Sequence, residues 1–249
     1  MRRITTVALA AGVFLVPACG NDSQSTDDLT VFAAASLTEA FMAIGDAFGA
    51  EYPDADITFN FASSSDLARQ IVEGAPADVY ASADPINMEK VTAGGTATDQ
   101  PVVFATNRAE IIVASGNPLG LTGVDDLATQ DLVVVVCAPE VPCGTYADEI
   151  FANAGIEVTP DSFEENVKAV VTKVTLGEAD AGIVYATDVR AAAGDAGGVV
   201  LPDDLNVIAE YPIVVTSDAG RATMAQLFID FVLGPAGRQI LESYGFGTP

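Results

Sequence analysis

Residues 29–62 read LTVFAAASLTEAFMAIGDAFGAEYPDADITFNFA, and this stretch indicates how the chain folds. Leu29 to Ala33 has the composition of a short strand. Ser36-Leu37-Thr38-Glu39 has the form of a helix capping box. Apolar residues then recur at helical spacing, which predicts a helix over about 37–50, and Ile57 to Ala62 resembles a strand again. A strand, a helix and a second strand in succession are typical of α/β folds with parallel sheets.

The same alternation of strands and helices continues along the chain. Ser63-Ser64-Ser65-Asp66 begins a second helix, and Val103 to Ala105 and Ile111 to Ala114 are predicted as strands. Apolar runs at 132–136 and 181–185 are typical of parallel strands that are buried on both faces. No linker marks a domain boundary, which is compatible with two lobes between which the chain crosses twice. The predicted fold class is α/β with mainly parallel sheets.

The composition narrows the possible classes of function. The sequence has 249 residues, half of them apolar, with no histidine and a formal net charge of -25. A Ser-His-Asp or Cys-His catalytic pair therefore cannot form, and transition-metal sites built on imidazole are excluded. The ten Lys and Arg residues are scattered and provide no basic face for nucleic acid. We expect a globular protein that is not an enzyme and does not bind nucleic acid.

The beginning of the sequence resembles an export signal. A short positive region precedes an apolar stretch at 7–16 that is too short to span a bilayer comfortably. Val16-Pro17-Ala18-Cys19 resembles the bacterial lipoprotein signal, so we expect removal of residues 1–18 and lipidation of Cys19. An ordinary secretory signal that is cleaved nearby is the alternative. Residues 19–28 are polar and are predicted to be a flexible tether that holds the protein on the outer face of the cell membrane.

Cys137 and Cys143 are the remaining cysteines. Outside the cytoplasm, a pair at this spacing is expected to form a disulfide rather than a metal site or a nucleophile. Two unpaired buried cysteines are the alternative. The loop that the bridge would close is small, so its main effect should be to rigidify residues 138–142.

Four residues lie at or near predicted helix N-termini that follow a strand or loop: Ser36, Ser64, Cys143 and Val167. The first turn of a helix offers unpaired N–H groups and a partial positive charge, and in α/β sheets such ends gather where ligands bind. Helix ends from both lobes could converge on one anion. Taken singly, however, the two serines could be helix caps, and Val167 and Tyr185 could be core residues.

Motifs in both halves of the chain resemble a known family. The segments are VFAAASLT (31–38), FASSS (61–65), PEVPCG (139–144), ENVKA (165–169) and GIVY (182–185). They resemble segments of the ModA family, the periplasmic molybdate-binding proteins, and the similarity runs in register from about residue 29 to the end. The resemblance implies a two-lobed periplasmic binding protein fold of type II, with the ligand in the cleft between the lobes. Lobe 1 would comprise residues 29–106 and 212–249, and lobe 2 residues 107–211.

The resemblance also implies how an oxyanion would be held. Five residues would donate hydrogen bonds to it: Ser36, Ser64, Cys143, Val167 and Tyr185. The serines and the tyrosine would use their hydroxyls, and the serines, Cys143 and Val167 would use backbone N–H groups. The family commonly has alanine at the position of Cys143, and a backbone contact should tolerate this change. No Lys or Arg is expected to contact the ligand, including Arg69 and Lys168.

The implied function is that of an extracytoplasmic solute-binding lipoprotein without a cofactor, acting as a monomer. It would capture molybdate or tungstate as the oxyanion and deliver it to a membrane-embedded ABC permease. A site made only of donors disfavours a protonated anion such as hydrogen phosphate. A binding protein for sulfate, phosphate or another tetrahedral oxyanion is the alternative. An exported serine hydrolase would lack a histidine base and a Gly-x-Ser-x-Gly elbow. A structural or adhesive lipoprotein would leave the matched motifs unexplained.

Overall fold

The computed structural model describes residues 28–129 and 131–249. The predicted signal peptide, the lipidation site Cys19 and nearly all of the predicted tether lie outside the described residues. Within the described ranges, no helix combines the length and the apolar character needed to cross a membrane.

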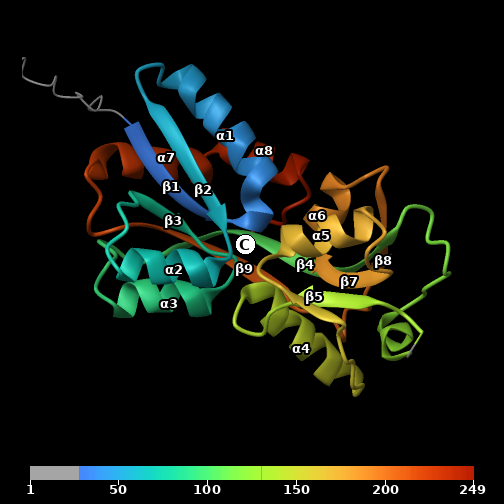
Figure 1. Ribbon diagram of the computed structural model, residues 1–249. Coiled ribbons are helices and arrows are strands. Elements are labelled where there is room, and N and C mark those ends of the chain that lie inside the picture. The colour runs from blue at the N-terminus through green and yellow to red at the C-terminus, as the bar shows by residue number, and fades with distance from the viewer. Residues whose placement is uncertain (1–27, 130) are drawn as a thin grey trace, which may run out of the picture.

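Alternating strands and helices build the first lobe, at the left of Figure 1. Its strands are β1 (Asp28–Ala34), β2 (Asp56–Ala62) and β3 (Val79–Ala81). Its helices are the 3-10 turn η1 (Ala35–Leu37), α1 (Thr38–Glu51), α2 (Ser64–Val72), α3 (Pro85–Ala93), α7 (Ala222–Leu233) and α8 (Pro235–Ser243). β1 pairs in parallel with both β2 and β3. Helices α2 and α3 cover one face of this sheet, and α1, α7 and α8 cover the other, so both faces are buried.

The second lobe repeats this organisation. Its strands are β5 (Val134–Cys137), β6 (Ser162–Glu164), β7 (Ala181–Tyr185) and β8 (Ala196–Val200). Its helices are the 3-10 helix η2 (Val124–Ala128), α4 (Pro142–Ala154), α5 (Val167–Thr175) and α6 (Ala186–Ala191). β5 pairs in parallel with β6 and β7. One hydrophobic cluster joins η2 and α4 to one face of the sheet, and α5 packs on the other.

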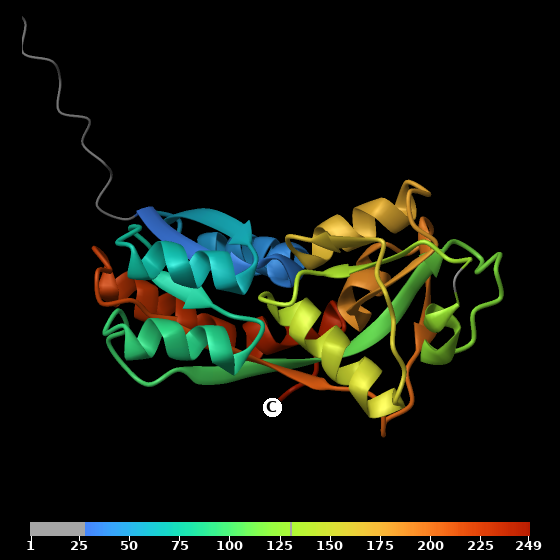
Figure 2. The same cartoon turned by 60° about the horizontal axis from the view of Figure 1, so that its bottom comes forward.

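Two strands connect the lobes, β4 (Val102–Ala114) and β9 (Ile208–Val215). Figure 2 shows them running together from one lobe to the other. The first half of β4 pairs with β9, and its second half pairs with β7 and β8. The expected lobe boundaries, after Thr106 and before Pro212, thus fall inside strands. The chain changes lobe within a sheet, which explains why no linker marks the boundary in the sequence.

The α/β class and the two lobes are confirmed. The expectation of mainly parallel sheets holds among β1, β2 and β3 and among β5, β6 and β7. It fails for β4 and β9, whose pairings are antiparallel. The physical reason is the connection itself, because one strand carries the chain out of the first lobe and its neighbour carries it back.

Candidate functional site

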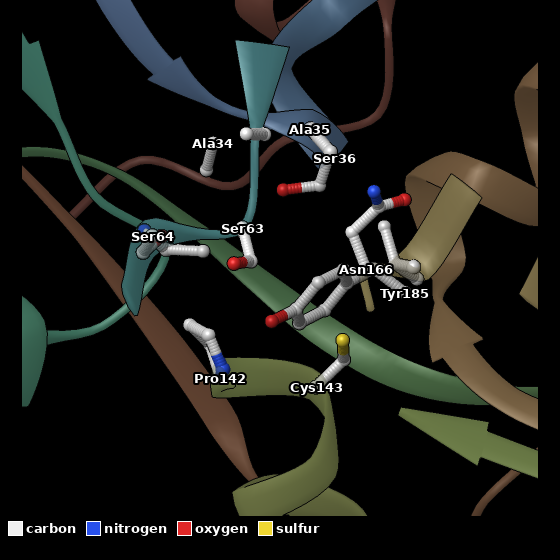
Figure 3. Close-up of a pocket in the computed structure, with 12 residues that line it drawn as sticks. Ala34, Ala35, Ser36, Ser63, Ser64, Pro142, Cys143, Asn166 and Tyr185 are labelled. Atoms are coloured by element: carbon white, nitrogen blue, oxygen red, sulfur yellow. Dashed lines mark hydrogen bonds between the residues drawn. The ribbon is translucent and has the colours of Figure 1, made fainter. Parts of the chain in front are cut away.

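A small pocket lies between the lobes, where strands end and helices begin (Figure 3). The first lobe contributes Ala34, Ala35, Ser36, Ala62, Ser63, Ser64 and Ala83, and the second lobe contributes Pro142, Cys143, Asn166, Val167 and Tyr185. The structure therefore brings all five sequence-predicted site residues together in one lining. Among the described residues, those that line this pocket carry no charged side chain.

Ser36 lies in η1, the turn that links β1 to α1. The predicted capping box at residues 36–39 is wrong, because Leu37 is the N-cap of α1 and no side chain caps that end. The Ser36 hydroxyl instead lies 2.9 Å from the Tyr211 hydroxyl, and Glu39 pairs with Lys168. Both side chains of the apparent box are therefore used in contacts between distant parts of the chain.

Ser64 is the first residue of α2, and its neighbour Ser63 is the helix cap. The Ser63 hydroxyl accepts a hydrogen bond from the backbone N–H of Asp66 at 3.2 Å. The Ser64 hydroxyl accepts one from the backbone N–H of Ala83 at 2.9 Å. A backbone N–H can only donate, so the hydrogen of the Ser64 hydroxyl remains available to an acceptor in the pocket.

The second lobe presents two more helix N-termini. Cys143 lies in the first turn of α4, and Val167 is the first residue of α5, which Asn166 caps by accepting from the Ala169 N–H. The N–H groups of Ser64, Cys143 and Val167 have no acceptor within their own helices, because an intrahelical partner exists only from the second turn onward. The partial positive charge of these helix ends adds to the attraction for an anion.

A disulfide between Cys137 and Cys143 joins the end of β5 to the start of α4, with the two Cα atoms 5.6 Å apart. The backbone packs closely at the same point. A Cβ atom on Gly144 would lie 1.9 Å from the carbonyl oxygen of Ala138, so only glycine fits there. The bridge and this close packing hold the first turn of α4 against the 138–141 loop.

Tyr185, at the end of β7, is buried, with 3% of its surface exposed. Its hydroxyl points into the space between Ser63 and Pro142 (Figure 3) and has no hydrogen-bond partner among the described residues. Burial raises the pKa of this hydroxyl well above its ordinary value, so it keeps its proton. A buried hydroxyl without a partner is costly, and an acceptor bound in the pocket would remove that cost.

The two cations named from the sequence form ion pairs outside the pocket lining. Lys168 lies 2.8 Å from Glu39 and 2.9 Å from Asp188. Arg69 pairs with Asp66 and Glu73 on the exposed side of α2. The absence of a Lys or Arg contact to the ligand stays a prediction, and the charge-free lining favours it.

Sequence reasoning missed two polar residues beside the pocket, Asn107 on β4 and Tyr211 on β9. Tyr211 contacts Ser36, which lies 175 positions earlier in the chain. Asn107 donates a hydrogen bond to the Thr187 hydroxyl at 2.8 Å. No local pattern in the sequence relates residues so far apart, and only the packing of the two connecting strands brings them together.

Comparison with known proteins identifies the family. Residues 29–247 match the family described as bacterial extracellular solute-binding protein. The molybdate-binding protein ModA of Mycobacterium tuberculosis (strain ATCC 25618 / H37Rv) is 39% identical over 255 residues, covering 99% of this chain and 97% of the relative. The corresponding protein of Escherichia coli (strain K12) is 33% identical, covering 91% of each chain.

Solved structures show the same fold. The periplasmic molybdate-binding protein of Azotobacter vinelandii superposes with a TM-score of 0.79 at 20% identity, covering 89% of this chain and 99% of that one. The sulfate-binding protein SubI of Mycobacterium tuberculosis H37Rv gives 0.77 at 17% identity, covering 88% and 86%. These likenesses confirm the periplasmic binding protein fold of type II. From the family match and the identity to its relatives, the chain belongs to the bacterial extracellular solute-binding proteins and, among them, to the ModA family.

Proposed function

We propose that this protein is an exported lipoprotein that binds molybdate, or the similar oxyanion tungstate, and delivers it to an ABC permease. The observation that carries the site is the buried Tyr185 hydroxyl, which has no partner among the described residues and points into an uncharged pocket. Ser36, Ser64, Cys143 and Val167 surround the same space and supply hydroxyl and backbone donors. The identity to ModA relatives supports molybdate as the ligand.

Neutral donors suffice to hold a dianion. A hydrogen bond to a charged acceptor contributes roughly 1.5–3 kcal/mol, so several donors around one anion can offset its desolvation. The formal charge of -25 does not prevent binding. At physiological ionic strength the Debye length is about 8 Å, which screens most surface carboxylates from the pocket. Lys168, which directly follows the lining residue Val167, is paired with Glu39 and Asp188.

The family consists of solute-binding proteins, so the prediction that the chain is not an enzyme is confirmed. Binding of this kind requires no cofactor. An extracellular solute-binding family also agrees with export of the protein. Lipid attachment at Cys19, delivery to a permease and a monomeric state belong to the proposal. Replacement of Cys19 by serine should release the protein from the cell membrane into the soluble fraction, and retention of this variant at the membrane would refute the anchor.

We also propose that residues 29–106 and 212–249 move as one body and residues 107–211 as the other. The hinge would lie in β4 and β9, and the lobes would close on the ligand. Two contacts across the pocket support closure. The Tyr146 hydroxyl donates to the Ala83 carbonyl at 3.3 Å, and Lys168 pairs with Glu39.

Calorimetry with molybdate, tungstate, sulfate and hydrogen phosphate tests the function. We expect tight binding of molybdate and tungstate, and a free energy of unfolding that rises by several kcal/mol when the ligand far exceeds its Kd. Ser36→Ala and Ser64→Ala should each weaken binding about tenfold or more, since each removes a donor to a charged acceptor. Tight binding of sulfate or phosphate instead would favour the alternative ligands. Unchanged affinity in both variants would show that the site is wrong.

A further inference from the structure

A chain of buried polar groups leads from the connecting strands to the pocket. The Ser36 hydroxyl lies 2.9 Å from the Tyr211 hydroxyl. The amide nitrogen of Asn107 lies 3.4 Å from the same tyrosine oxygen and 2.8 Å from the Thr187 hydroxyl. Ser36, Asn107 and Tyr211 are all at most 4% exposed, so water does not replace these contacts.

The direction of each hydrogen bond in this series of polar groups follows from Asn107, whose side-chain orientation is fixed by the backbone. The backbone N–H of Arg108 donates to the side-chain oxygen of Asn107 at 2.9 Å, which decides which end of the amide is the NH₂ group. That NH₂ can only donate, so it gives one hydrogen to Thr187 and the other to Tyr211. The Tyr211 oxygen accepts from Asn107. The hydrogen of this buried hydroxyl needs an acceptor, and the Ser36 oxygen is the one within hydrogen-bond distance among the described residues, so Tyr211 donates to Ser36. The hydrogen of Ser36 is left to face the pocket.

We propose that Asn107 and Tyr211 are positioning residues that fix the Ser36 hydroxyl as a donor. They thereby make the pocket select fully ionised tetrahedral oxyanions over those that carry a proton. This role rests on the proposed function, because it concerns the ligand class of the same pocket. It goes beyond the five predicted contacts, since neither Asn107 nor Tyr211 lines the pocket.

Ser64 is fixed in the same sense by a different group. Its oxygen accepts from the backbone N–H of Ala83, which can only donate. Both serine hydroxyls therefore accept a hydrogen bond whose direction is fixed, by the Ala83 N–H for Ser64 and by Asn107 acting through Tyr211 for Ser36. Both then turn their own hydrogens toward the ligand. The two devices differ in one respect that an experiment can use. The donor to Ser64 is backbone, whereas the donor to Ser36 is the side chain of Tyr211, which Asn107 orients in turn, and both of these side chains can be replaced.

The direction of the serine hydroxyls determines whether the pocket favours a protonated or a fully ionised oxyanion. A free hydroxyl can turn its lone pairs toward a ligand O–H, but a hydroxyl whose oxygen already accepts within the protein presents its hydrogen. Molybdate is fully ionised near neutral pH and only accepts. Hydrogen phosphate brings one O–H, which would meet a donor and leave both groups unpaired.

The variant Asn107→Asp reverses the polarity with almost no change of shape. The new carboxylate still accepts from the Arg108 N–H, and its other oxygen faces two hydroxyls that can both donate to it. Tyr211 would then give its hydrogen to residue 107 and accept from Ser36. The Ser36 oxygen would turn its lone pair toward the pocket. The variant therefore converts the Ser36 hydroxyl from a donor to an acceptor toward the ligand.

The measurement is competition between molybdate and hydrogen phosphate at slightly alkaline pH, where both are dianions. The added carboxylate repels both dianions alike. The ratio of their Kd values therefore reports whether the Ser36 hydroxyl acts toward the ligand as a donor or as an acceptor. We expect Asn107→Asp to lower the ratio of phosphate Kd to molybdate Kd at least about tenfold, the size of one misdirected hydrogen bond. Tyr211→Phe, which frees the Ser36 hydroxyl to turn either way, should lower the same ratio by a smaller factor.

Thr216→Val is the matched control. Thr216 is also buried in the first lobe, but its hydroxyl donates to the Ala77 carbonyl oxygen, and neither residue lines the pocket. This variant should leave the Kd ratio unchanged. If the wild-type protein binds no oxyanion, the proposed function fails and the role of Asn107 fails with it. If the wild type binds molybdate but the ratio of phosphate Kd to molybdate Kd falls in neither Asn107→Asp nor Tyr211→Phe, only the positioning role is overturned.

Discussion

The Lys168 ammonium lies 2.9 and 2.8 Å from the two carboxylate oxygens of Glu39, and this ion pair joins the lobes beside the pocket. Lys168 directly follows the site residue Val167, and Glu39 lies in the first turn of α1. Asp188 holds the same ammonium at 2.9 Å. Burial would lower the pKa of Lys168, but the two carboxylates outweigh it and raise the pKa. The pair therefore connects the two lobes directly beside a residue that lines the pocket.

Glu39→Gln should weaken the closed form. The substitution removes the charge across the lobes and leaves Lys168 neutralised by Asp188. Partly exposed ion pairs contribute roughly 0.2–1 kcal/mol, so the molybdate dissociation rate should rise up to about fivefold. Stopped-flow displacement at low and high salt measures it, and the difference between variant and wild type should shrink at high salt. Glu73→Gln, which breaks an exposed pair within α2, is the control. Equal dissociation rates for all three proteins at low salt would contradict the role.

The sequence predicted the local features of this fold better than the long-range ones. The strand β1, the helix α1 and the capping of α2 by Ser63 follow from short patterns, because apolar spacing and caps act within a few residues. The apparent capping box at 36–39 failed for the opposite reason. Ser36 and Glu39 have partners 175 and 129 positions away, and a partner at that distance leaves no trace in local spacing.

The connecting strand β4 also shows that local sequence patterns do not report long-range contacts. Residues 103–105 and 111–114 were predicted as two strands, and the structure has one strand through the polar residues between them. Two of those polar residues have partners elsewhere in the fold: Asn107 is buried and donates to Thr187, and Arg108 pairs with Asp203. The predicted helix N-termini indicated that an anion site was possible, but the family resemblance was needed to choose the five site residues. Val167 and Tyr185 are 2% and 3% exposed, which residue type alone would attribute to a core.

Replacing both bridged cysteines, Cys137→Ala with Cys143→Ala, should separate stability from binding. The contact expected from Cys143 is its backbone N–H, which alanine also has. Loss of a bridge over so short a loop should lower the free energy of unfolding by about 2 kcal/mol, and molybdate affinity should change only a few-fold. Urea unfolding and calorimetry measure the two quantities. A loss of affinity of about a hundredfold or more would assign the contact to the sulfur or to the bridged loop geometry.

Gly144→Ala should lower the affinity for molybdate more than loss of the Cys137–Cys143 disulfide does. The added Cβ would lie 1.9 Å from the Ala138 carbonyl oxygen, so the first turn of α4 or the facing loop must move. Overpacking of this kind costs about 1–3 kcal/mol of stability, and it displaces the Cys143 N–H next to it. The control is Gly49→Ala in α1, where nothing lies within 4 Å of the added atom. That change should stabilise the helix by roughly 0.5–1 kcal/mol. Equal affinity for molybdate in both variants would show that the α4 N-terminus is not a contact.

Tyr185→Phe should move stability and affinity in opposite directions. The wild-type hydroxyl is buried and has no partner among the described residues, so its removal should leave the ligand-free protein as stable or more stable by about 1 kcal/mol. Molybdate affinity should fall about tenfold or more, because a hydrogen bond to a charged acceptor is lost. Thermal unfolding without ligand and calorimetry with it give the two values. A destabilised variant with unchanged affinity would make Tyr185 a packing residue only.

Alkaline pH should unfold the protein through its buried tyrosines. Burial raises the pKa of Tyr80, Tyr185 and Tyr211 above the ordinary value, so the folded state keeps protons that the unfolded chain releases above about pH 10. The stability from these groups is fully present below pH 10 and is lost as pH rises toward the raised values, by about 1.4 kcal/mol per pH unit for each tyrosine. Urea unfolding at a series of pH values measures the slope. Tyr185→Phe should reduce that slope by the share of one tyrosine, since it removes one of the protons that the unfolded chain releases. A wild-type stability that stays constant well above about pH 10 would mean that these hydroxyls ionise freely, and Tyr185 could then not be relied on as a permanent donor to an anion.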